Sequence, residues 1–142
     1  MRIKLFKQIT LPTKKRESDA GWDVYLPEDI TFKAAKNNNG DGVTTVDLGF
    51  GVALPKGYAG LFAMRSSVCK TGLQIQAPLI DEGYLGELHL IICNYTDHDI
   101  TYKKDERVCS LFIYPVYNDI LEVVDDLGTS DRNTNWNGSS GR

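Results

Sequence analysis

Hydrophobic residues occupy alternate positions in several short segments of this chain, and turn-forming residues separate those segments. The alternation is clear in RIKLF, WDVYL and ELHLIIC, while VCSLFIYPV and ILEVV are runs of strand-forming residues. A period of two places every second side chain on one face, as in a strand with one buried side. The sequence has no amphipathic pattern long enough for a full helix. Many short strands with regular turns predict an all-β barrel or sandwich.

Glycine, proline, asparagine and aspartate cluster between the predicted strands, where they favour turns. The clusters are LPED, NNNGDG, GFG, LPKGYAG, DEGYLGE, NYTDHD and KKDE, and NNNGDG has the composition of an exposed hairpin loop. One short helix is predicted in SSVCKTGL, where Ser66 or Ser67 can cap the start and Gly72 can end it. The strands are predicted to stop near Asp125, where a polar tail begins.

The length of 142 residues suits one domain, and 42% hydrophobic with 25% charged residues predicts a packed core. The net charge of -3 and the pI of 5.3 argue against nonspecific binding to duplex nucleic acid. No apolar run approaches the roughly 20 residues of a membrane helix, and the N-terminus lacks the features of a signal peptide. We therefore expect a cytoplasmic protein without nucleic-acid or membrane partners.

The three cysteines, Cys69, Cys93 and Cys109, are odd in number and widely spaced. This pattern predicts neither a disulfide framework nor a metal site. We expect the cysteines to act as small hydrophobic residues in a reducing cytoplasm. His89 and His98 have no second histidine or cysteine at ligand spacing, so we expect surface or strand positions for them.

The segment MRSSVCKTG combines an arginine with two serines at the start of the predicted helix. Backbone N–H groups and hydroxyls at the positive end of a helix bind phosphate, and Arg65 adds a charge-assisted donor. A plain N-cap beside a solvated arginine explains the same residues. On this segment alone, the plain cap is the better interpretation.

The segment PLIDEGYLGE predicts a hairpin, because a strand ends, an acidic turn follows and the chain returns as ELHLIIC. Asp81 lies at the shoulder of this hairpin, and Gly83 and Gly86 permit tight geometry. A carboxylate fixed there can orient a water molecule for attack, and Tyr84 offers a flat face to a sugar or base. A turn aspartate beside an exposed tyrosine is the alternative.

Asp23 lies in the strand-like segment DAGWDVYL, where its alternation partners are Gly21 and Tyr25. Its carboxylate can hold magnesium through water. A solvent-facing aspartate on a strand has the same pattern and is the more common case.

The C-terminal stretch SDRNTNWNGSSGR contains no core-forming residue except Trp136, and tails of this composition are usually disordered. Its glycines and serines can nevertheless wrap a phosphate with backbone N–H groups. Arg132 and Arg142 can add charge, and Trp136 can stack on a base.

The order of these segments resembles that of the dUTP pyrophosphatase (dUTPase) family, the all-β homotrimeric type with five short motifs in fixed order. The matching segments are AGWDVY at 20–25, RSSVCKTGL at 65–73, LIDEGYLGEL at 79–88, DERVCSLFIYPV at 105–116 and RNTNWNGSSG at 132–141. The resemblance spans nearly the whole chain. It implies a jelly-roll-like β-barrel over residues 1–127 and a flexible arm over residues 128–142.

The resemblance also implies roles for individual residues. Asp81 matches the aspartate that activates the attacking water, and Tyr84 matches the tyrosine whose ring leaves no room for a 2'-hydroxyl. Asp23 matches the aspartate near a hydrated magnesium ion (Mg2+). The implied substrate-binding residues are Arg65, Ser66, Ser67, Gly72, Leu79, Ile80, Tyr84, Ser110, Arg132, Trp136, Gly138, Ser139 and Ser140.

The implied reaction converts dUTP and water to dUMP and pyrophosphate, which limits uracil in DNA and supplies dUMP for dTMP synthesis. Such chemistry needs positioning and charge neutralisation more than a covalent nucleophile, and magnesium would chelate the triphosphate. Backbone groups of the hairpin would read uracil, and cytosine would leave a buried group unpaired at a cost of about 1–3 kcal/mol. Each site of the trimer would combine the hairpin of one subunit, motifs one, two and four of a second, and the arm of a third.

Four positions depart from the family pattern. Pro78 stands where the third motif often has glycine, and Gly83 replaces a frequent second aspartate. Ser110 stands where the fourth motif usually has a glutamine that contacts phosphate, so a water would bridge that contact or it would be missing. In the fifth motif, Asn137 separates the aromatic residue from the glycine that follows it.

Two alternatives to a dUTPase follow from the same resemblance. The related dCTP deaminase shares the fold and two of the motifs, but its general acid/base glutamate would fall at Ile91. A dUTPase-like protein that acts mainly by binding a regulatory partner is the second alternative. Asp81, Tyr84 and the complete tail favour an active enzyme over this alternative.

Overall fold

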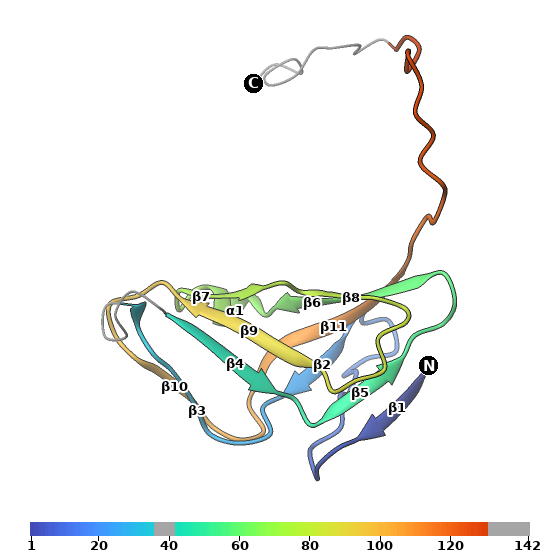
Figure 1. Cartoon of the computed structure of the whole chain (residues 1–142). Helices are drawn as coiled ribbons and strands as arrows, with labels where there is room; N and C mark the ends of the chain where they lie inside the picture. The colour runs from blue at the N-terminus through green and yellow to red at the C-terminus, as the bar shows by residue number, and fades with distance from the viewer. Residues whose placement is uncertain (36–41, 131–142) are drawn as a thin grey trace.

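The computed structural model describes residues 1–35 and 42–130, which form an all-β body with a long C-terminal segment leading away from it (Figure 1). The α-helix of this part of the chain is α1 (Ser66–Cys69). The strands are β1 (Arg2–Leu5), β2 (Trp22–Tyr25), β3 (Ile30–Phe32), β4 (Val43–Asp47), β5 (Phe50–Ala53), β6 (Tyr58–Met64), β7 (Leu73–Gln76), β8 (Leu79–Ile80), β9 (His89–Asn94), β10 (Ile100–Tyr102) and β11 (Arg107–Pro115). The predicted all-β fold with one short helix is confirmed.

Two antiparallel sheets position the candidate site. The larger sheet has the strand order β2-β11-β6-β8, and its longest ladder pairs β6 with β11 from Met64 and Cys109 to Tyr58 and Pro115. The second sheet has the order β4-β9-β7. The pairs β1-β5 and β10-β3 complete the described part, so each of its sheets is built from antiparallel neighbours.

One hydrophobic core draws on strands from all four sheets. The alternation predicted for ELHLIIC is present in β9, where Leu90 and Ile92 are buried while His89 is exposed. Each fully buried large apolar side chain stabilises the fold by about 1.5–3 kcal/mol. The largest of them are Phe32, Phe50, Leu26, Leu48, Leu73, Leu90, Ile92, Leu111, Val24, Val46, Val68 and Val108.

The cysteines differ in their surroundings, although all three are free thiols. Cys109 is buried in the core, and burial raises the pKa of its thiol, so it behaves as the small hydrophobic residue that was expected. Cys69 is exposed, and the expectation of a hydrophobic role is wrong there because the short helix α1 buries only Val68.

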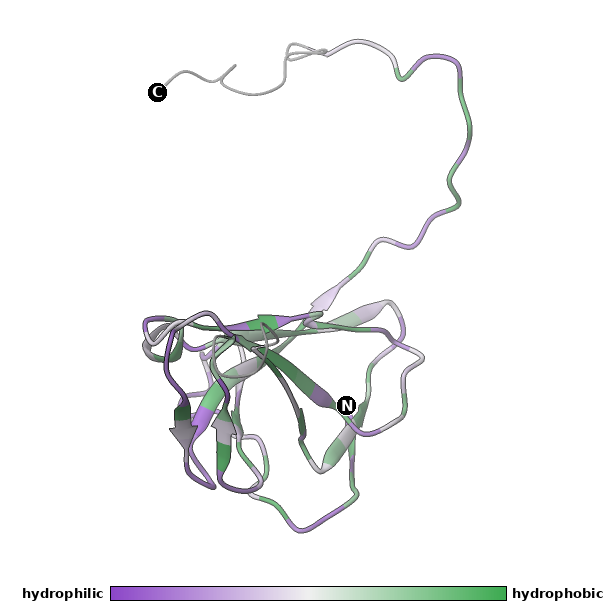
Figure 2. Cartoon of the chain, turned by 60° about the vertical axis from the view of Figure 1, so that its left-hand side comes forward, coloured by the Kyte–Doolittle hydropathy of each residue, from purple (hydrophilic) through white to green (hydrophobic). Residues whose placement is uncertain are grey.

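The C-terminal segment differs from its prediction. The run Ile120–Val124 is expected as a strand, yet the described chain has no strand after Pro115. Hydrophobic and hydrophilic residues alternate along this segment (Figure 2), and no neighbouring strand of the same chain pairs with it. The side chains of Ile120, Leu121, Val123 and Leu127 are each at least 90% exposed. A strand-like pattern without a partner cannot form a strand alone.

Two further sequence expectations concern the ends and loops of the chain. The predicted hairpin loop NNNGDG falls almost entirely at residues outside the described ranges. Helices long and apolar enough to span a bilayer are absent from residues 1–35 and 42–130. The cytoplasmic location stays a prediction.

The chain changes from one sheet to another between β7 and β8. β7 pairs with β9 as far as Gln76 opposite Ile91, while β8 pairs with β6 through Ile80 opposite Gly60. At the change, Ala77 has a φ of 45°, and the Pro78 carbonyl accepts a hydrogen bond from the Phe62 N–H at 3.0 Å. The positive φ is unfavourable for alanine and turns the chain away from β9. A gap therefore opens between β8 and β9.

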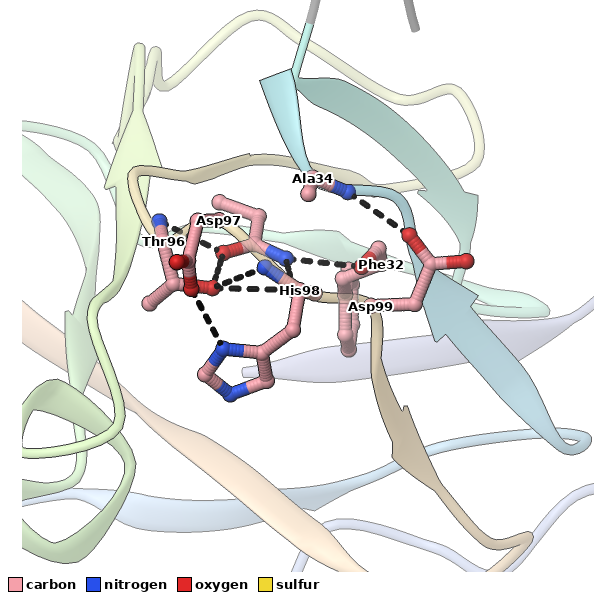
Figure 3. A network of polar contacts seen from close by, with 7 residues as sticks. Phe32, Ala34, Thr96, Asp97, His98 and Asp99 are labelled. Carbon is pink, nitrogen blue, oxygen red and sulfur yellow. Dashed lines mark hydrogen bonds and ion pairs between the residues drawn. The ribbon is translucent and has the colours of Figure 1, made fainter. Parts of the chain in front are cut away.

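A buried polar network closes the turn after β9 (Figure 3). The side-chain amide of Asn94 donates to the carbonyls of Phe32 at 2.8 Å and His98 at 2.9 Å. Its oxygen accepts the backbone N–H of Thr96 at 3.0 Å and the Thr96 hydroxyl at 2.7 Å. Asn94 is 1% exposed, so its hydrogen bonds hold β3, β9 and the turn together without help from bulk water.

Replacing Asn94 with alanine should lower the free energy of unfolding by about 2–3 kcal/mol, because buried carbonyl and N–H groups lose their partner. The midpoint of urea unfolding, followed by fluorescence at fixed protein concentration, measures the loss. Asn118→Ala is the matched control, since Asn118 is exposed beyond the last strand. An Asn94→Ala midpoint equal to that of the control would contradict the structural role.

Candidate active site

An open hollow of about 210 Å³ lies in the gap where the chain changes sheets. Its lining residues come from β6, the β7–β8 connection, β8, the hairpin tip and β9, and they are Phe62, Ala77, Leu79, Ile80, Asp81, Tyr84, Leu88 and His89. Five of these eight residues have apolar side chains. Asp81 supplies the carboxylate of the hollow, and that carboxylate forms no ion pair within the described ranges.

The hairpin that carries Asp81 has a defined geometry. The Tyr84 N–H donates to the Asp81 carbonyl at 3.1 Å, and the Tyr84 hydroxyl donates to the Glu87 carbonyl at 2.7 Å. A Cβ at position 86 would lie 2.7 Å from the Tyr84 hydroxyl, so Gly86 is required for this pose. The tyrosine ring is thus held beside the carboxylate.

The backbone of His89 faces the gap. Hydrogen-bonded and non-bonded pairs alternate along an antiparallel ladder, and Leu88 makes the bonds to the β4–β5 side through Leu48 and Phe50. The N–H and carbonyl of His89 consequently point away from β4, toward the side of β9 that β7 occupies. The pairing of β7 with β9 ends at Ile91, so β7 does not reach His89. The ring Nδ1 of His89 lies 2.7 Å from Asp47 Oδ1 on the neighbouring strand.

A second cluster forms around Asp23 on β2. Its Oδ1 accepts from Arg65 Nη1 at 3.0 Å, and its Oδ2 accepts from Arg107 Nη1 at 2.8 Å. The Ser110 hydroxyl is 3.4 Å from Oδ1. The cluster carries one more positive than negative charge and borders a hollow of about 370 Å³. The residues that line this hollow are Arg65, Ser67, Val68, Tyr102, Asp105, Glu106 and Arg107.

A β-bulge brings Arg107 into this cluster. Ser110 lies opposite Asp23 and Arg107 lies opposite Tyr25, with the irregularity between Arg107 and Cys109. Residues three apart on a regular strand would face opposite sides, but the extra residue of a bulge restores them to one side. The sequence analysis did not select Arg107, and alternation alone would have placed it on the face opposite Ser110. Its position in the segment DERVCS, which matches the fourth motif, was the sequence feature that could have identified it.

The helix α1 begins differently from its prediction. Arg65, in an extended conformation, is the N-cap residue, and no side chain caps the helix. The capping role expected for Ser66 or Ser67 is therefore wrong, and both serines are exposed instead. Gly72 follows the helix with a φ of 93°, and a Cβ there would lie 2.4 Å from Thr96 Cγ2. Glycine is the residue that fits this helix end.

The departures from the dUTPase pattern have structural outcomes. The Ser110 hydroxyl points to Asp23, so it supports that carboxylate and does not extend outward as a glutamine would. Pro78 lacks an N–H and its carbonyl is used by β6, which leaves the opposite edge of the gap to His89. A Cβ at Gly83 would meet nothing within 4 Å, so no steric constraint requires glycine there.

The two clusters lie at different ends of β6. Asp81 follows Ile80, which pairs with Gly60, whereas Arg65 follows Met64 at the other end of the strand. At roughly 3.4 Å per residue, about 15–20 Å of strand separates these levels, and the two hollows share no lining residue. The structure thus groups Leu79, Ile80, Asp81 and Tyr84 in one hollow, and Asp23, Arg65, Ser67 and Ser110 around the other. Arg132, Trp136, Gly138, Ser139 and Ser140 lie outside the described residues.

The donor set indicates how magnesium could be held. The described residues contain no group of three or more His, Cys, Asp or Glu side chains able to hold a metal ion. Both oxygens of Asp23 already accept guanidinium N–H bonds, but a carboxylate has about four lone-pair sites. With the Ser110 hydroxyl as a third donor, one site remains for a water molecule. These residues fit an ion that arrives on a phosphate ligand and contacts Asp23 through water.

The fold and its two hollows define an all-β protein with an aspartate carboxylate in one hollow and two arginines beside two acidic residues in the other. The family model described as dUTPase matches residues 7–141. The deoxyuridine 5'-triphosphate nucleotidohydrolase of Saccharomyces cerevisiae is 36% identical over 93% of this chain and 87% of the yeast protein. The enzyme of the same name from Paramecium bursaria Chlorella virus 1 is 32% identical, over 97% and 94% respectively.

The fold is also similar to those of solved dUTPase structures. The Staphylococcus bacteriophage 80alpha dUTPase with dUpNHpp is 25% identical, has a TM-score of 0.83 and matches 99% of this chain and 98% of its own. A dUTPase from phage phi11 of S. aureus, 21% identical with a TM-score of 0.75, is described for its coordination of a structural Mg(II) ion. This chain belongs to the dUTPase family. The predicted family and the predicted dUTP hydrolysis are confirmed, and enzymes of this family depend in general on magnesium.

Replacing Arg107 with alanine should raise the KM for dUTP about tenfold or more, because a hydrogen bond to a charged group contributes about 1.5–3 kcal/mol. Arg107→Lys should recover part of the loss, since lysine keeps the charge but not the planar fork. Steady-state pyrophosphate release at varied dUTP concentration measures the KM of both variants.

Lys33→Ala is the control for loss of one positive charge, since Lys33 is exposed and pairs with Asp99 away from both hollows. If Arg107→Ala and Lys33→Ala gave the same KM, Arg107 would have no part in binding the substrate.

Proposed function

We propose that this protein hydrolyses dUTP to dUMP and pyrophosphate with a water molecule that Asp81 orients. The observation that carries the proposal is the carboxylate of Asp81, which has no ion-pair partner among the described residues and lines the same hollow as the fixed ring of Tyr84. A carboxylate in that position can accept a proton from water as the water attacks. The phosphoanhydride bond between the α- and β-phosphates breaks, and pyrophosphate leaves.

The gap between β8 and β9 is the proposed base site. Uracil offers an N3–H donor between two carbonyl acceptors, which complements a backbone carbonyl and N–H such as those of His89. Cytosine has an acceptor at N3 and a donor at C4, so it would leave buried groups unpaired. Leu79 and Ile80 form the apolar wall beside the base.

Tyr84 is the proposed sugar contact. Its hydroxyl is bound to the Glu87 carbonyl, so the ring is held in one orientation over the hairpin. A ribose would have to place its 2'-hydroxyl against this fixed ring, which neither moves nor offers a hydrogen bond on its face. The arrangement favours the deoxyribose over the ribose.

Arg65, Arg107 and Ser67 are the proposed phosphate ligands, with Ser66 beside them. A helix of four residues has little macrodipole, so charge and hydroxyls from these side chains supply the binding. Asp23 holds both guanidinium groups in place before the substrate arrives. Magnesium on the triphosphate would lower the negative charge that opposes the water.

We infer further that the enzyme is a homotrimer in which each site draws on several subunits. The separation of the two hollows supports this, because one dUTP molecule cannot easily span them within a chain. The exposed apolar residues of the C-terminal segment, among them Ile120, Leu121 and Val123, give it a surface to bury on another subunit. Residues 128–142 are the proposed arm, with Arg132, Ser139 and Ser140 on the outer phosphates and Trp136 near the base.

Asp81→Asn should reduce kcat for dUTP by a factor of about 100 or more, because asparagine cannot accept the proton of the water. The Kd for a non-hydrolysable dUTP analogue should change less than about threefold, since the side chain keeps its size. Pyrophosphate release and calorimetric titration measure the two constants. Normal turnover by this variant would remove Asp81 from the mechanism.

A chain truncated before Arg132 should lose most activity, since it lacks the proposed arm, while its thermal unfolding stays unchanged. Mixing it with Asp81→Asn, after joint unfolding and refolding, should restore activity. Mixed trimers contain sites with an intact Asp81 from one subunit and an intact arm from another. If the mixture stays as inactive as its two components, each site belongs to a single subunit.

A further inference from the structure

Glu82 directly follows the catalytic aspartate but turns away from the hollow that Asp81 lines. Its side chain is half-buried, and Oε2 accepts the backbone N–H of Gly57 at 2.6 Å. It is absent from the residues that line either hollow of the site. A charge-assisted bond of this length is strong for a side chain on a hairpin tip.

Gly57 is itself held in place by the β6–β11 end of the sheet. It lies in the turn before β6 with a φ of 77°, and its carbonyl accepts the Val116 N–H at 2.9 Å. The next residue, Tyr58, forms the last pair of the β6–β11 ladder with Pro115. Glu82 therefore connects the hairpin to the end of the longest ladder in the described structure.

The hairpin tip has few other restraints. β8 contributes two residues of pairing, and Asp81 comes immediately after them. Gly83 has open space around it, and Leu85 is 66% exposed. The Tyr84 N–H bond to Asp81 closes the turn upon itself but does not tie it to the body of the protein.

The returning side of the hairpin has its own restraint. Glu87 Oε1 accepts the Gly49 N–H at 2.7 Å, and the Glu87 carbonyl accepts the Tyr84 hydroxyl. The two glutamates thus make the same kind of contact, each to the N–H of a glycine with positive φ. Glu82 restrains the side of Asp81, and Glu87 restrains the side of Tyr84.

We propose that Glu82 is a positioning residue for Asp81, holding the catalytic carboxylate in register with the phosphate through its hydrogen bond to Gly57. The inference rests on the proposed role of Asp81. Displacing a catalytic group by about 1 Å can lower a rate by about 100-fold while the ground-state contacts persist. Loss of Glu82 consequently affects kcat, whereas loss of the Glu87 side chain affects the fit of the nucleoside and so KM.

Four variants test this with steady-state dUTP hydrolysis and thermal unfolding. Glu82→Ala should lower kcat by about tenfold or more with KM within about twofold of wild type, as expected for a misplaced catalytic group. Glu82→Gln keeps an acceptor oxygen and should retain kcat within about threefold. Glu82→Asp keeps the charge but is one methylene too short, so its kcat should fall as in the alanine variant. Glu87→Ala should raise KM more than it lowers kcat.

Asp99→Ala is the remote control, because Asp99 also accepts a backbone N–H, that of Ala34, and neither residue lines a hollow of the site. Both constants should match wild type for it. The inference is overturned if Glu82→Ala keeps wild-type kcat, if Glu82→Gln is as impaired as Glu82→Ala, or if Glu87→Ala lowers kcat equally. Should Glu82→Ala not fold, the contrast between Glu82→Gln and Glu82→Asp decides.

Wild type and Asp81→Asn are run in the same assay to separate this inference from the proposed function. Wild-type turnover that survives Asp81→Asn would contradict the proposed mechanism itself. Wild-type turnover that is abolished by Asp81→Asn but unaffected by Glu82→Ala would contradict only the positioning role.

Discussion

The ladder between β6 and β11 is the constraint on which the functional features depend. One end of it leads into Arg65 and Arg107, which share Asp23 as a common partner. The other end leads into Gly57 and Val116, which hold the hairpin of Asp81 and the C-terminal segment. Because an antiparallel ladder fixes register residue by residue, it also fixes how far apart the two hollows lie. The proposal of a site shared between subunits rests on that distance.

Much of the fold and part of the site were predictable from sequence. The period-two pattern located the strands around Asp23 and Ile92 correctly, since burial of one face leaves a direct mark on composition. The pattern failed at Ile120–Val124, because strand formation needs a partner strand that this chain does not supply. Arg107 was missed because a bulge changes which side a residue faces without changing its type.

The cluster around Asp23 shows how one carboxylate can serve two arginines. Two guanidinium groups this close would repel each other without the shared anion, and their side chains would lose the orientation proposed for binding phosphate. Sequence reasoning found Arg65 and Asp23 separately, from a helix start and from a strand. It could not show that they contact each other, because they are 42 positions apart and meet only when β2 pairs with β11.

At the gap between β8 and β9, the edge of β9 has no neighbouring strand among the described residues. Exposed strand edges invite other chains to add to them, and proteins protect such edges by keeping them short. Here the edge is restricted by the two residues of β8, by Pro78 and by the positive φ of Ala77. A planar ring with donors and acceptors along its rim can complete this edge where a peptide cannot enter. In the proposed function the uracil base takes the place of the absent strand, so that ligand binding would complete the hydrogen bonding of this edge.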